Sequence, residues 1–233
     1  MGAKSRGALF AVVAAMVVLS VMALLGCSNS YSLTKDAALT SSWGDTVQFK
    51  VDSSWSNPAE DESSSNKTIC SGNWYNPDSP KLKNHVSVSL KNVNSSIYKD
   101  DDSRTYAGWR DSQIEQFSRS AEEQASIMNG LASTSKSKSY TADDFPSFSD
   151  CKVEDKGSVS VGGNEVRTYA VTYHYKYSDK LYQDIKNQDQ SIKQEGEMTK
   201  YCGLIKDGKH DLEVETVDSG LLKDVLSTME FSW

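Results

Sequence analysis

The stretch that decides the fold of this chain is EVRTYAVTYHYKY, residues 165–177. Successive side chains of a β-strand point to opposite faces of a sheet. The odd-numbered positions from 169 to 177 are Tyr or Val and share one face, whereas the even-numbered positions from 166 to 174 carry smaller or more polar side chains. The preceding Gly162-Gly163-Asn164 suits a tight hairpin, because Gly and Asn tolerate positive φ. We therefore predict a long strand paired with residues 150–161.

The tyrosine face of this strand is a candidate binding surface. It carries Tyr169, Tyr173, Tyr175 and Tyr177, and aromatic side chains with a polar end are common where a protein meets a ligand. The alternative, which we favour, is that a helix covers these rings and leaves their hydroxyls at the wet rim of the core. Which of the two holds depends on whether the face is open or covered.

The rest of the pattern extends the sheet on both sides of this strand. Apolar residues alternate with polar ones in the other strand segments, whereas spacing of three and four residues marks two amphipathic helices. The predicted elements are strands at 46–55, 67–76, 85–93, 150–161, 165–177, 196–205 and 211–217, and helices at 103–128 and 219–229. We expect an α+β fold, with an antiparallel sheet of about seven strands in two meanders sandwiched by α-helices.

Three carboxylates share one face of the last predicted strand. They are Asp211, Glu213 and Glu215, which alternate with Leu212, Val214 and Thr216. A metal site or an acid–base pair is one interpretation of such a row. The commoner one is the exposed side of an edge strand, since charged side chains protect sheet edges from unwanted pairing. We expect the second.

The N-terminus has the order of an export signal. Lys4 and Arg6 precede an apolar run from Ala8 to Leu25 that only Ser20 interrupts, and Leu24-Leu25-Gly26-Cys27 follows. This ending resembles the bacterial lipobox. The resemblance implies that Cys27 is lipidated, that residues 1–26 are removed, and that the acyl chains hold the protein on a membrane. The alternative is an uncleaved anchor, because the 18-residue run is near the lower limit of about 17–25 residues for a spanning helix.

Composition divides the remainder into a tether and one domain. Residues 27–45 are rich in Ser, Thr and small residues and predict a flexible tether, and residues 46–233 predict a single α/β sandwich domain. Loss of the two basic residues of the leader takes the net charge from −7 to −9. An acidic chain without a basic stripe argues against a nucleic-acid partner.

Three cysteines remain beside Cys27, an odd number for an oxidising compartment. If the strands of Cys151 and Cys202 both flank residues 165–177, two strand spacings of about 4.8 Å separate them, beyond the roughly 7 Å limit between bridged α-carbons. Any disulfide is then expected to join Cys70 to Cys151 or Cys202, with three free thiols as the alternative. Because the sequence holds no Cys-x-x-Cys and its three histidines are isolated, we expect no metal site and no cofactor.

The element order also resembles a known family. The opening strand VQFKVDSSW at 47–55 and the closing LSTMEF at 226–231 are similar to those of the PsbP-like group. That resemblance implies an antiparallel sheet between helices and an accessory or assembly protein that binds other proteins, and it transfers no binding residue.

These patterns lead to one expected function and two rivals. We expect a lipid-anchored, extracytoplasmic binding or accessory module, held on the bacterial cell membrane or on an outer membrane, whose partner is a protein or another envelope component. One rival is an envelope hydrolase whose site is assembled from distant residues, since neither Gly-x-Ser-x-Gly nor His-Glu-x-x-His occurs. The other is a small-molecule carrier. The sequence predicts no oligomeric state.

Overall fold

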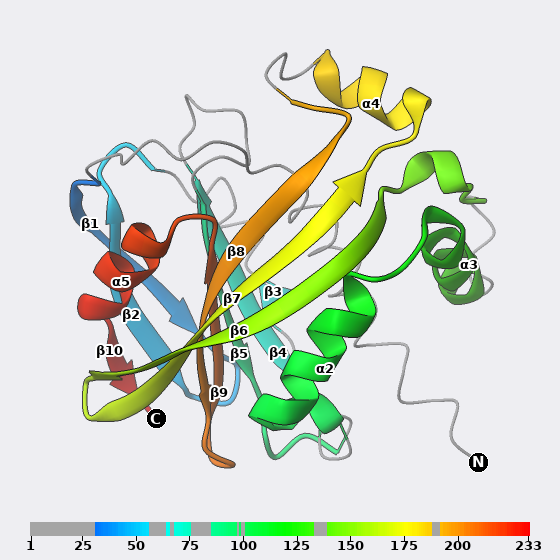
Figure 1. Cartoon of the computed structure of the whole chain (residues 1–233). Coiled ribbons are helices and arrows are strands. Elements are labelled where there is room, and N and C mark those ends of the chain that lie inside the picture. Colours follow the sequence, from blue (N-terminus) through cyan, green and yellow to red (C-terminus); the bar gives the residue numbers. More distant parts are fainter. Residues whose placement is uncertain are drawn as a thin grey trace.

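The computed structural model is an α+β fold with two antiparallel sheets (Figure 1). It describes residues 31–55, 64–65, 68–75, 85–96, 98, 101–132, 139–187 and 192–233. Residues 1–30, including the predicted signal peptide and Cys27, lie outside this described part of the chain. Among the described residues, no helix is both long enough and apolar enough to cross a membrane.

The larger sheet has seven strands in the order β3-β4-β5-β9-β8-β7-β6. Strand β7 carries the stretch quoted above and lies between β6 and β8, as predicted. Strand β9 pairs with β5 on one side and β8 on the other, so that it joins the two meanders. The bounds are β3 Ser64–Ser65, β4 Ile69–Tyr75, β5 His85–Lys91, β6 Ser147–Val161, β7 Asn164–Lys176, β8 Glu195–Lys206 and β9 Asp211–Thr216.

The smaller sheet corrects the predicted tether. Strand β1 (Leu33–Thr40) pairs with β2 (Thr46–Asp52) along its whole length, and β10 (Glu230–Ser232) pairs with the other edge of β2. In β1 only Leu39 is fully buried, while most of its other side chains are exposed. The backbone pairing with β2 therefore holds a polar strand in the fold, and the folded domain begins before residue 46.

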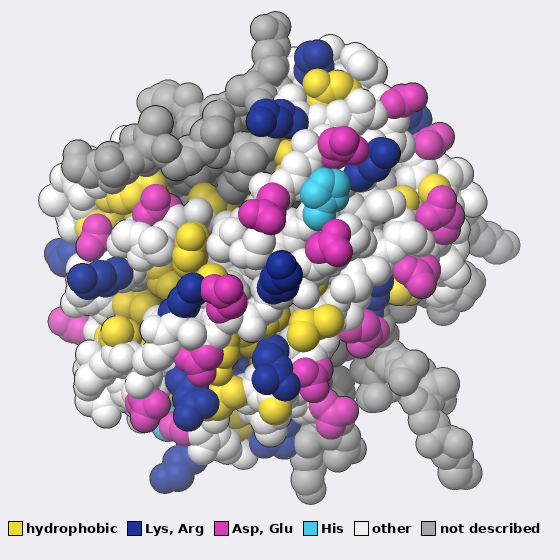
Figure 2. Space-filling view, in the orientation of Figure 1, with side chains coloured by type: hydrophobic (Ala, Val, Ile, Leu, Met, Phe, Trp, Pro, Cys, Tyr) yellow, Lys and Arg dark blue, Asp and Glu magenta, His cyan; other side chains and the backbone are white. Residues whose placement is uncertain are grey.

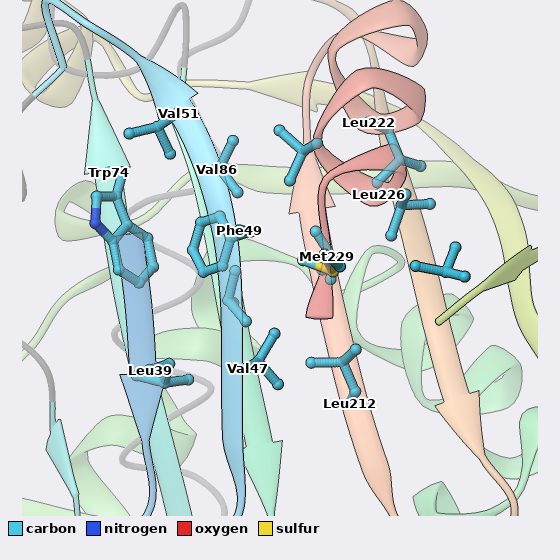
Figure 3. Packing of buried hydrophobic residues seen from close by; sticks show 14 of the residues in the cluster. Leu39, Val47, Phe49, Val51, Trp74, Val86, Leu212, Leu222, Leu226 and Met229 are labelled. Carbon is cyan, nitrogen blue, oxygen red and sulfur yellow. The ribbon is translucent and has the colours of Figure 1, made fainter. Parts of the chain in front are cut away.

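The two sheets enclose the main hydrophobic core (Figure 3). Leu39, Val47, Phe49 and Val51 of the small sheet face buried residues of the large sheet, and helix α5 (Ser219–Ser227) packs beside them. Helix α5 approaches β8 closely at Gly203, because an added Cβ would lie 3.2 Å from Leu226 and that side chain would have to shift by a few tenths of an ångström. One face of the large sheet is thus covered by a sheet and a helix, where a helical layer alone was expected.

Helices α2 (Tyr106–Gln116), α3 (Ala121–Ala132) and α4 (Asp179–Lys186) lie on the side of the large sheet that carries the tyrosine row. The prediction of a single helix at 103–128 is wrong, because the helix is interrupted between the end of α2 and the start of α3. The reason is a capping box: Glu123 N donates to Ser120 Oγ at 3.2 Å, and Ser120 N donates to Glu123 Oε2 at 2.8 Å. A new helix start is therefore favoured inside the continuous apolar stripe.

Candidate binding site

The tyrosine row is covered, so it is not a binding surface. Tyr169, Tyr173, Tyr175 and Tyr177 are all buried. Phe117 stacks on Tyr173 with ring centroids 4.1 Å apart. The hydroxyl of Tyr173 donates to Met198 Sδ at 2.9 Å inside the core instead of reaching a wet rim, and burial holds the pKa of Tyr173 well above its ordinary value. The candidate surface is corrected to a core layer.

The carboxylates of β9 are buried as well, and the prediction of an exposed edge strand is wrong. Because β9 lies inside the sheet, Asp211, Glu213 and Glu215 face helix α2 and the neighbouring strands. Their partners are close: Lys206 Nζ lies 2.8 Å from Asp211 Oδ2, Lys200 Nζ lies 2.6 Å from Glu215 Oε2, and Trp109 Nε1 donates to Glu213 Oε1 at 3.0 Å.

This cluster behaves electrostatically as a balanced network. Burial would raise the pKa of Glu213, but Lys91, Lys200 and Lys206 lower it below the ordinary value. Burial acts against the charge of Lys200, yet Glu215 raises the pKa of this lysine above its ordinary value. Buried charges persist when they are paired and hydrogen-bonded. The network fixes α2 on the sheet through Trp109.

Three groups of the network could in principle approach one metal ion. Ligand atoms of Cys202, Glu213 and Glu215 lie within 4.8 Å of one another. Burial holds the pKa of the Cys202 thiol well above its ordinary value, whereas metal binding requires the thiolate. Glu215 and Glu213 are already bound by Lys200 and Trp109. The arrangement therefore serves as a structural ion-pair network.

The expected disulfide is wrong for a topological reason. Cys70 lies on β4 and Cys202 on β8, with β5 and β9 between them. Three strand spacings amount to about 14 Å, twice the reach of a disulfide, and Cys151 on β6 lies farther still. Cys70, Cys151 and Cys202 form no disulfide, and burial raises the pKa of Cys151 to about 11, with Lys200 opposing it. Cys151 and Cys202 do flank β7, as predicted.

A pocket of about 380 Å³ lies at one end of the domain. Four segments that are distant in sequence meet there: the β1–β2 turn, the residues after β5, the β8–β9 turn and the C-terminus, at the lower end of Figure 1. The described residues that line it are Trp43, Asp45, Asn92, Val93, Asn94, Lys209, His210 and Trp233. This volume falls in the range of about 300–1,000 Å³ that is typical of small-molecule sites.

Aromatic rings form one part of the pocket wall. Trp233 stacks against His210, with centroids 4.3 Å apart, and against Phe231 at 4.7 Å. Trp55, Trp74 and Trp109 are buried, whereas Trp43 is half-buried and Trp233 is 37% exposed. The chain has five tryptophans, so the two that solvent reaches are the two at the pocket.

Two short turns hold polar side chains at the pocket in fixed positions. Asp45 Oδ2 accepts a hydrogen bond from Trp43 Nε1 at 2.7 Å, next to Gly44 with its positive φ of 107°. After β5, Asn92 Oδ1 accepts from Asn94 N at 3.0 Å. Side chains that bond to nearby backbone groups stabilise turns of this kind. The pocket wall is therefore organised before any ligand binds.

The β8–β9 turn is organised by Asp207. Its Oδ1 accepts from the backbone N–H groups of Lys209 and His210 at 2.8 and 2.7 Å, and its Oδ2 lies 3.0 Å from His210 Nδ1. Partial burial alone would raise the pKa of Asp207, but the hydrogen bonds from His210 and Lys209 lower it below the ordinary value. The carboxylate orients the imidazole so that its other nitrogen, Nε2, remains for a ligand.

Sequence reasoning missed the pocket because no one segment carries it. Each contributing stretch has only a turn signal, such as Asp207-Gly208, and the C-terminal aromatic residues resemble the end of a strand.

On the surface seen in Figure 2, acidic and basic side chains are interspersed and form no patch of one sign.

No known protein-family model matches this chain, and no curated protein matches it significantly.

Proposed function

We propose that this protein is a lipid-anchored, extracytoplasmic binding module of the bacterial envelope, and that the pocket between Trp43 and Trp233 is its binding site. The observation that carries the proposal is the position of the pocket at the end of the domain opposite to the point where the chain enters it. Tyr31, the first described residue, lies against Trp55 at the start of β1, and the pocket follows the end of β1.

The distances fit such an orientation. The eight residues of β1 span about 26 Å at roughly 3.3 Å per residue. The four residue-to-residue steps from Cys27 to Tyr31 reach at most about 14 Å when fully extended. A lipid on Cys27 therefore holds the Tyr31 end near the membrane, and the pocket faces the space beyond it. The partner we propose is an envelope component in that space.

Membership of the PsbP-like group remains part of the proposal. The antiparallel sheet and its helices support it. The second sheet, built from β1, β2 and β10, is a feature that the resemblance did not imply. A binding role also suits the pocket chemistry, since the eight described lining residues combine two tryptophans with a few polar side chains.

Cosedimentation with envelopes tests the proposal. The lipidated protein, purified in detergent, is incubated with detergent-washed envelopes of its host bacterium. We expect wild-type protein to sediment with them and the double variant Asn94→Ala/Lys209→Ala to remain in the supernatant. Asn187→Ala/Lys223→Ala is the matched control, because both residues are exposed and lie outside the pocket lining, Asn187 at the C-cap of α4 and Lys223 on α5. Equal sedimentation of the pocket variant and the control would refute the assignment of the pocket.

A further inference from the structure

We infer that the ligand of this pocket is a short, uncharged saccharide or the exposed end of a glycan chain. This inference rests on the proposed function and names the ligand class of the same site. A sugar ring presents C–H groups on its faces and hydroxyl groups around its edge. A matching site needs aromatic carbon on one wall and groups that both donate and accept hydrogen bonds on another, and the pocket has both.

The aromatic wall supplies the first requirement. The face of an aromatic ring is electron-rich and attracts the weakly positive hydrogens of C–H groups. Trp43 is half-buried and fixed by its bond to Asp45, and it is the ring that can offer a face to a sugar. Trp233 is fixed by stacking on Phe231 and His210, so it adds the apolar edge of its ring beside Trp43. Because these rings are held before binding, a ligand loses little affinity to their ordering.

The polar wall supplies the second requirement. The side-chain amide of Asn94 offers both a carbonyl acceptor and an N–H donor, and the ammonium of Lys209 offers donors. Neither side chain makes a hydrogen bond within the described part of the chain. The imidazole of His210 turns Nδ1 to Asp207, so Nε2 of its neutral form accepts. Such a mixture suits hydroxyl groups, which donate and accept at once.

Other ligand classes fit less well. A phosphorylated ligand calls for several cationic groups or a row of backbone N–H groups, but the described lining has one lysine, one aspartate and no arginine. A quaternary ammonium ion prefers a cage of several aromatic rings, whereas the described lining has two tryptophans and also carries the positive charge of Lys209. The volume, about 380 Å³, is near the lower end of the range for ligand sites and therefore suits a short saccharide.

Selective destruction of envelope components tests this assignment. One sample of envelopes is treated with periodate, which destroys vicinal diols, and with a muramidase, which cuts wall glycan. A second sample is treated with a protease instead. We expect the lipidated protein to lose cosedimentation after the glycan treatment and to keep it after the protease. Loss after the protease alone would show a protein partner and overturn the saccharide assignment, while the requirement for Asn94 and Lys209 would still support the proposed function.

A competition assay, in which defined soluble probes are added during cosedimentation, is the second test of the saccharide assignment. N-acetylglucosamine, its β-1,4-linked dimer, maltose and the soluble fragments released by the muramidase are compared with choline, inorganic phosphate and the peptide acetyl-D-Ala-D-Ala. We expect a saccharide probe or the glycan fragments to compete, and Asn94→Ala to weaken that competition roughly fivefold, as for one neutral hydrogen bond. Competition by choline, phosphate or the peptide, with none from any saccharide, would overturn the assignment.

Discussion

Substitution of Lys206 by Met should severely destabilise the domain. The side chain of Lys206 is 0% exposed, and its ammonium donates to both carboxylate oxygens of Asp211, at 3.0 and 2.8 Å. Asp211 is 2% exposed and also accepts a hydrogen bond from the hydroxyl of Tyr98. Lys206→Met therefore leaves a buried carboxylate whose compensating cation is missing.

The magnitude follows from that geometry. Removal of one partner of a buried ion pair costs about 3–5 kcal/mol, a large share of a typical stability of about 5–15 kcal/mol. With an m-value of about 3 kcal/mol/M, the urea midpoint should fall by roughly 1–1.7 M. The exposed pair of Lys50 and Asp36 is the matched control, because its side chains are 45% and 88% exposed and Lys50→Met should cost less than about 1 kcal/mol.

A second variant separates charge from packing. Lys206→Met/Asp211→Leu/Tyr98→Phe removes the whole buried pair and the hydroxyl that bonds to it. Replacement of a buried pair by apolar residues is often neutral or stabilising, so this variant should regain most of the loss. Urea unfolding followed by circular dichroism measures the wild type and all three variants. A cost below about 1 kcal/mol for Lys206→Met, or no recovery in the triple variant, would refute the reasoning.

Three further predictions concern other parts of the chain. Glu213 has a folded-state pKa below its ordinary value. Its carboxylate therefore contributes stability that is fully present above pH 4.5 and is lost as the pH falls through the folded pKa. We expect the urea midpoint of Glu213→Gln to depend less on pH between 6 and 3 than that of the wild type. Ser120→Ala removes the cap of α3 and should cost about 0.5–2 kcal/mol in the same unfolding assay, and a cost equal to that of Ser227→Ala, late in α5, would contradict the capping role. Cys27→Ser should abolish labelling by a palmitate analogue and, on cell fractionation, release or mislocalise the folded domain, whereas continued lipidation and membrane retention would contradict the lipobox assignment.

The sequence predicted the elements whose side-chain pattern reflects their own burial. Strand β7 is the clearest case, because its tyrosines and valine alternate with smaller residues and pack under α2. Strand β1 was missed because its place in the sheet depends on pairing with β2 and on only one buried side chain, Leu39. The polar composition of β1 is that of a tether, and only its pairing with β2 in the folded chain shows that it is a strand.

Features that depend on distant partners could not be read from local patterns. The carboxylates of β9 resemble an exposed edge until the lysines of β8 are placed opposite them, as Lys200 is beside Glu215. The break between α2 and α3 is different, since Ser120 and Glu123 form a recognisable capping box that the apolar stripe obscured. The pocket joins four segments with no common motif, so its residues become a site only in the folded chain.

Tryptophan fluorescence tests the central claim most directly, because the two tryptophans that solvent reaches both line the pocket. The lipidated protein in detergent is titrated with soluble envelope fragments, and the emission is followed in wild type and in Trp43→Phe/Trp233→Phe. We predict a saturable change in the wild type that disappears in the double variant, with acrylamide quenching of the wild type reduced when fragments are bound. An unchanged emission, or the same change in the double variant, would contradict the claim that the pocket binds an envelope component.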